Sequence, residues 1–165
     1  MIKRLWCIPF LALGACSEPS FYFRGYSNHS GCGGVIDAEL ANGAIFEDAY
    51  DDLLSEGTGL VTELTGEIFE TPVRIDVGCY RDSIVGFVSY VSLQENADAS
   101  DEIHERFSQV LDDAFGVAEE RSTADGRSKI YYCTEDAKVV LAEAVLAETE
   151  YEVSLVVVPY PRDCD

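Results

Sequence analysis

We expect the first fifteen residues of the chain to be separate from the folded domain that follows them. Lys3 and Arg4 give a positively charged start, the run from Leu5 to Ala12 is apolar, and small residues end the segment. This arrangement is typical of a secretory signal peptide, and the run is shorter than the roughly 20 residues that span a bilayer. We therefore predict that residues 1–15 are removed. The remaining 150 residues then form one domain of ordinary size in an oxidising compartment.

The end of this segment, Leu13-Gly14-Ala15-Cys16, resembles the lipobox of bacterial lipoproteins. The resemblance covers the signal alone. It implies that Cys16 becomes the lipidated N-terminus and anchors the protein to a membrane through several acyl chains. Ser17 stands where family members held in the inner membrane carry Asp, which implies the outer membrane facing the periplasm. Residues 16–34 would then be the lipid anchor and a tether.

Four cysteines remain after the signal and the lipid site are set aside. An even number of cysteines in an oxidising compartment predicts two disulfides, and three pairings are open. Zinc is the competing interpretation, but its cysteine ligands normally come in close pairs that this chain lacks. Only His29 and Cys32 have a ligand-like spacing, so we predict no metal. The disulfide candidates are Cys32, Cys79, Cys133 and Cys164.

The mature domain is strongly acidic. It holds 31 acidic residues and, once Lys3 and Arg4 are removed, 9 basic ones, for a net charge of −22. From Gly25 to Val73 there is no Lys or Arg. Such a surface repels nucleic acids and anionic lipid headgroups and attracts cationic partners. The charge alone also fits a solvated surface that keeps the domain soluble.

Helical patterns occur twice in the chain. Residues 35–55 carry an imperfect apolar stripe with acidic residues opposite, and Asn42-Gly43 could split this segment in two. Residues 100–115 give a clearer helix with Ser100 as its N-cap and Gly116 as its stop.

The rest of the chain has the patterns of strands and hairpins. Ala124-Asp125-Gly126 is a strong hairpin signal, and the run from Leu155 to Val158 is typical of a buried inner strand. The predicted strands are residues 60–66, 67–77, 84–93, 117–123, 127–133, 138–147 and 151–159.

These elements predict an α+β fold. We expect one acidic domain over residues 35–165, in which an antiparallel sheet of about six or seven strands has two helices on one face and two disulfides. A helix followed by about three strands could be a tandem duplication, with repeats at 35–93 and 100–159 and Cys79 aligned with Cys133.

The residues beyond Cys16 contain no motif that names a chemistry. Nucleophilic catalysis needs a histidine base, yet His29 falls in a Gly- and Ser-rich loop and His104 falls off the apolar stripe of its helix. Pairs of carboxylates are frequent among 31 acids and are not specific, and no calcium-binding loop pattern occurs. We therefore predict no catalytic residues, no cofactor and no metal.

A lipid-anchored envelope protein of this kind is most simply a non-enzymatic binding module for another envelope component. Two alternatives remain. The protein could be an acidic inhibitor or immunity protein against a cationic envelope hydrolase, because opposite charge speeds capture. It could instead be an envelope hydrolase that uses paired carboxylates, which would require a pocket holding two acids.

Overall fold

The computed structural model describes residues 22–27, 29–54, 57–80, 84–116, 118, 120–124, 127–134, 137–147 and 149–159. Within these residues the chain forms a two-stranded hairpin, two helices and eight long or medium strands. In chain order they are β1 (Tyr22–Phe23), β2 (Tyr26–Ser27), α1 (Cys32–Ala41), β3 (Ile45–Leu54), β4 (Gly57–Ile68), β5 (Thr71–Cys79), β6 (Val85–Gln94), α2 (Ala97–Phe115), β7 (Glu120–Ala124), β8 (Arg127–Cys133), β9 (Ala137–Ala147) and β10 (Glu150–Pro159).

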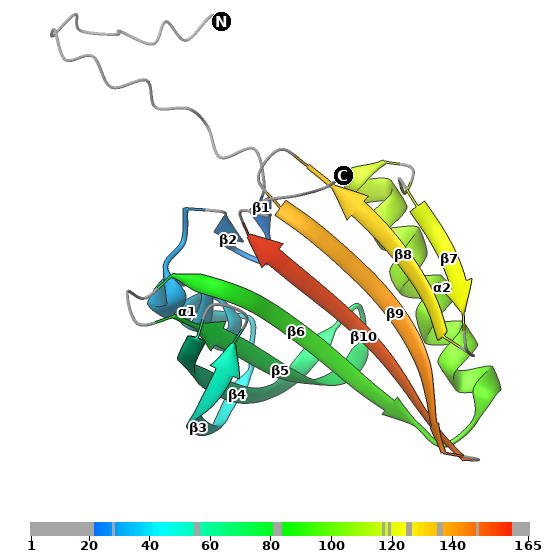
Figure 1. Ribbon diagram of the computed structural model, residues 1–165, viewed down its shortest axis with the longest axis horizontal. Coiled ribbons are helices and arrows are strands. Elements are labelled where there is room, and N and C mark those ends of the chain that lie inside the picture. The colour runs from blue at the N-terminus through cyan, green and yellow to red at the C-terminus, as the bar shows by residue number, and fades with distance from the viewer. Residues whose placement is uncertain are drawn as a thin grey trace, which may run out of the picture.

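The eight strands form one antiparallel sheet. Its order is β3-β4-β5-β6-β10-β9-β8-β7, so β3 and β7 are its two edges (Figure 1). Each helix is followed by four strands that pair with their chain neighbours, and the two halves meet where β6 pairs with β10. The α+β class and the antiparallel sheet with two helices are thus confirmed. A duplication stays a prediction, and the proposed alignment is wrong, because Cys79 ends the third strand of its half and Cys133 ends the second.

One face of the sheet carries the core. Side chains alternate between the two faces of a strand, and Ile75 and Val77 of β5, Tyr90 of β6 and Leu155 of β10 are fully buried on the face that the helices cover. Helix α1 lies against β5, whereas α2 lies against β6, β8, β9 and β10. The opposite face of the sheet has no helix over it among the described residues (Figure 1).

Helix α2 has the apolar spacing and the glycine stop that the sequence predicts, but it begins three residues earlier than predicted. Ile103, Phe107 and Leu111 recur at helical spacing and are buried, and Gly116 ends the helix with a φ of 85°. The N-cap, however, is Asn96, whose side chain accepts a hydrogen bond from the Ala99 N–H at 2.9 Å. Ser100 is therefore buried inside the first turns rather than capping them.

The helix predicted over residues 35–55 is wrong in its second half. Helix α1 ends at Ala41, because Gly43 adopts a φ of +93° that turns the chain, and residues Ile45–Leu54 then form strand β3. The acidic residues taken for a solvated helix face lie on this exposed edge strand. The extra strand also explains why the sheet has eight strands instead of six or seven.

The structure describes both partners of one of the two predicted disulfides, Cys32–Cys79. It joins the first residue of α1 to the last residue of β5 across 47 residues of sequence. Cys133 is itself disulfide-bonded, but Cys16 and Cys164 lie outside the described residues, so its pairing stays a prediction.

Candidate functional site

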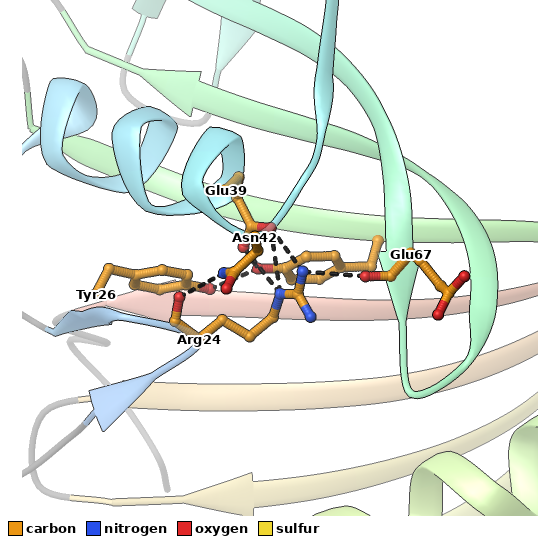
Figure 2. Close-up of polar contacts among 6 residues, drawn as sticks. Arg24, Tyr26, Glu39, Asn42 and Glu67 are labelled. Atoms are coloured by element: carbon orange, nitrogen blue, oxygen red, sulfur yellow. Dashed lines mark hydrogen bonds and ion pairs between the residues drawn. The ribbon is translucent and has the colours of Figure 1, made fainter.

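A buried ion pair joins the N-terminal hairpin to helix α1. Arg24, in the turn between β1 and β2, directs its guanidinium at the carboxylate of Glu39 (Figure 2). Its Nη2 lies 3.0 Å from Oε2, and its Nε lies 3.1 and 3.2 Å from Oε1 and Oε2. The Glu39 side chain is completely buried. Burial alone would lower the pKa of Arg24, but its hydrogen bond and charge interaction with Glu39 outweigh that effect and raise the pKa.

Two tyrosines complete the shell around this carboxylate. Tyr90 of β6 donates its O–H to Glu39 Oε1 at 2.6 Å, and the hydroxyl of Tyr26 in β2 lies 3.0 Å from that of Tyr90. Since Tyr90 has one proton to give, Tyr26 is the donor in the second bond. Burial is the main cause that raises the pKa of both phenols above the ordinary value of 10.0.

This cluster attaches the hairpin to α1 and β4, and its geometry does not suit a reaction site. Both Glu39 oxygens are already bonded, and Arg24 also donates to the Glu67 carbonyl at 3.0 Å (Figure 2). Asn42 at the end of α1 donates its side-chain amide to the Arg24 carbonyl at 2.8 Å. Phe23 of the same hairpin packs edge-on against Phe69. The hairpin thus fills part of the helix layer and leaves no open place at the carboxylate for a substrate.

A pocket of about 350 Å³ lies beside the disulfide. Its volume is at the small end of the range of ligand sites. The walls come from the start of α1, from β3 and β4, and from the end of β5, and Asp51 is the one carboxylate among the described lining residues. They are Cys32, Ile36, Asp51, Thr58, Gly59, Leu60, Thr62, Cys79 and Tyr80.

Large apolar side chains are exposed on the elements that line this pocket. Leu40 of α1 is 42% exposed, Phe46 of β3 is 54% exposed and Leu60 of β4 is 45% exposed. Phe46 lies opposite Leu64, and therefore on the face of the sheet that α1 covers. We call the pocket, which α1, β3, β4 and β5 line, the α1 groove. Exposed apolar side chains with polar residues around them often mark a surface that binds a partner.

The opposite face of the same strands carries a row of carboxylates. Asp48 of β3 lies opposite Glu63 of β4, which lies opposite Asp76 of β5. Asp76 is 9% exposed; its Oδ2 accepts a hydrogen bond from Arg74 Nε at 3.2 Å, while its buried Oδ1 has no partner among the described residues. Burial raises the pKa of the Asp76 carboxyl above 3.8 despite Arg74. Burial and then the charges of Asp76 and Glu63 also raise the pKa of Tyr50.

The residues predicted from the sequence are only partly brought together. Cys32 and Cys79 are joined, which removes Cys32 as a thiolate ligand for a metal with His29. His29 is exposed in a turn, and His104 is half-buried in α2. The lipid-attachment candidate Cys16 and the disulfide candidate Cys164 lie outside the described residues.

Neither the Arg24–Glu39 cluster nor the α1 groove was predicted from the sequence. The one signal for the cluster was Arg24, the last basic residue before a stretch without Lys or Arg, but its partner lies 15 residues away and the tyrosines come from separate strands. The groove depends on Asp51 and Leu60 belonging to paired strands, which the predicted helix concealed.

Across the described residues, no group of three or more His, Cys, Asp or Glu side chains could hold a metal ion. None of the described helices has both the length and the apolar character needed to cross a membrane. No known protein family matches the chain, and comparisons with curated proteins and with solved structures also find no match.

Proposed function

We propose that this protein is a lipid-anchored envelope protein whose acidic surface over α1, β3 and β4 binds a cationic protein. The observation that carries the proposal is the combination found there: exposed apolar side chains such as Phe46 and Leu60, and no basic residue from Gly25 to Val73. A cationic partner meets no positive charge from this stretch, and electrostatic attraction speeds its capture.

The kind of partner follows from the same surface. A basic protein with an apolar patch would place its charges beside Asp51 and its apolar side chains in the α1 groove. A cationic envelope hydrolase such as a muramidase has this chemistry, so an inhibitor or immunity role is the specific form of the proposal. The carboxylate-dependent hydrolase is less well supported, because Asp51 alone among the described pocket residues is acidic.

A titration against a basic muramidase of the lysozyme type tests the proposal. The native protein is compared with Asp48→Lys/Asp51→Lys, which reverses two charges on β3. The matched control, Asp101→Lys/Glu105→Lys, reverses two charges at exposed positions of α2 and changes the net charge by the same amount. At low salt we expect the β3 variant to bind at least about tenfold more weakly and the control to lose much less.

Two results would remove the proposal. Equal losses in the β3 variant and in the control would show that only net charge matters. Full activity of a panel of basic muramidases with excess protein at low salt would remove the inhibitor role.

The lipid anchor is proposed separately, on the lipobox-like residues. Metabolic labelling with a fatty acid tests it, since Cys16→Ser should abolish the label and release the protein from the membrane fraction. Unchanged labelling of that variant would contradict the anchor.

A further inference from the structure

Strand β3 is an open edge of the sheet. It pairs with β4 on one side, and no strand in the described part of the chain pairs with its other side. The strand is ten residues long, and every residue from Ile45 to Asp52 is exposed. An edge of this length presents a row of backbone N–H and C=O groups that another strand can pair with.

One of the backbone donors on this strand is held by a side chain. The Ala49 N–H donates to Asp48 Oδ1 at 2.8 Å, an interaction that the structure places at the exposed surface. The carboxylate of Asp48 thus occupies a backbone donor of the edge strand. Because the Asp48 side chain is exposed and can rotate away, the donor can be passed to an incoming strand.

The charges on β3 determine which kind of strand can pair with it. Its exposed acids are Glu47, Asp48, Asp51 and Asp52, and it has no basic residue. A second copy of β3 would place like charges opposite one another, which destabilises a strand pair, whereas lysine or arginine side chains at those positions would be favourable.

Apolar side chains on the same strand supply contact area. Ile45 is 65% exposed and Tyr50 is 41% exposed. Both point to the face of the sheet without helices, because Ile45 lies opposite Thr65 and Tyr50 lies opposite Val61. An added strand would cover them.

We propose that β3 takes up an extended, lysine- or arginine-rich segment of the partner as a ninth strand of the sheet. This inference rests on the proposed function and names its mode of binding. Backbone pairing supplies affinity in such strand addition, and the alternating side chains supply specificity. The partner is thereby a cationic protein with an extended segment, not a second copy of this chain.

The test compares two synthetic peptides on the native protein. One is Lys-Val repeated four times. The other keeps its length and its four lysines but replaces the two central valines by proline, which removes backbone donors and disfavours a paired strand. Hydrogen exchange of the amides in β3 and in the other edge strand, β7, is followed during titration.

We expect the proline peptide to bind about tenfold more weakly, since several backbone hydrogen bonds are lost. We also expect the first peptide to slow hydrogen exchange in β3 and not in β7. The variant Ala49→Pro removes the donor bonded to Asp48, and we expect it to bind the first peptide more weakly by a similar factor. The peptide comparison stands whether or not this variant folds.

Equal affinity for both peptides, or protection of β7 instead of β3, would overturn strand addition. If both peptides bind equally but Asp48→Lys/Asp51→Lys abolishes binding, the proposal of an acidic binding surface stands and strand addition is wrong. If neither the peptides nor the basic muramidase binds at low salt, the proposed function falls with it.

Discussion

Arg24 of the N-terminal hairpin and Glu39 of helix α1 lie 3.0 Å apart, with the Glu39 side chain fully shielded from solvent and that of Arg24 16% exposed. The pair connects the segment nearest the proposed lipid anchor to the helix that borders the α1 groove. A carboxylate buried this deeply is costly unless it is paired. The hairpin therefore keeps the buried Glu39 carboxylate paired, and it also buries Phe23 and Tyr26 in the core.

Removing one member of this pair should cost more than removing both. Arg24→Met leaves a buried unpaired charge, for which we expect a loss of about 3–5 kcal/mol in the free energy of unfolding. The double variant Arg24→Met/Glu39→Leu should lose clearly less. Chemical denaturation of the two variants and the native protein measures this. A single variant that costs less than about 1 kcal/mol would contradict a buried charge at Glu39.

The buried tyrosines predict a loss of stability at alkaline pH. The pKa of Tyr26 and of Tyr90 is raised above 10.0 in the folded protein, mainly by burial. Above pH 10 the unfolded chain therefore releases phenolic protons that the folded protein keeps, so the free energy of unfolding falls as the pH rises. Each tyrosine contributes a slope of up to about 1.4 kcal/mol per pH unit.

Denaturation curves between pH 9 and pH 11 measure this slope. Tyr26→Phe should reduce it, whereas Tyr151→Phe, at a half-buried position in β10, serves as the control. The same slope in native protein and Tyr26→Phe would show that the buried phenols do not set the alkaline limit.

Asp76 should be a destabilising residue at neutral pH. Its pKa is raised, chiefly by burial, so the folded protein binds this proton more tightly than the unfolded chain and gains stability as the pH falls through the raised pKa. Asp76→Asn removes the buried charge at the cost of an ion pair with Arg74, whose side chain is half exposed and adds little.

The variant should therefore be more stable than the native protein at pH 7, and its advantage should shrink toward pH 4. Asp48→Asn, at an exposed position of β3, is the matched control and should change stability little. A loss of stability in Asp76→Asn at pH 7 would mean that the Arg74 contact outweighs burial.

The second disulfide can be assigned chemically. Once Cys32 and Cys79 are joined, Cys133–Cys164 is the pairing left among the four candidates, and Cys133 does not carry a free thiol. Peptide mapping by mass spectrometry without reduction should find both linked peptides. A peptide that links Cys133 to any cysteine other than Cys164 would show that the assignment of the four cysteines is wrong.

The fold was predictable where local patterns agree with the final contacts. Strand β8 matches its predicted range, residues 127–133, and α2 ends at Phe115 as expected, because hairpin and helix-stop signals act over a few residues. The apolar alternation in the central strands also predicted that one face of the sheet is covered.

The remaining features depend on contacts that no local pattern reveals. The turn between β4 and β5 places Phe69 and Glu70 at positive φ without glycine or asparagine, and Phe69 is held there by packing against Phe107. Strand β3 is exposed from Ile45 to Asp52 and so lacks the alternation of a half-buried strand. The α1 groove and the Glu39 cluster join elements that are distant in sequence, and only the folded chain shows them.

Site-specific photo-cross-linking in intact cells tests the central claim, that the acidic surface over α1, β3 and β4 binds a cationic protein. A photoreactive amino acid replaces Phe46, which is exposed on the α1 side of β3, and, as the control, Tyr131 on β8 in the other half of the sheet. We expect position 46 to cross-link to a basic protein and position 131 not to do so. No cross-link at position 46, the same product from both positions, or an acidic partner would contradict the proposed binding surface.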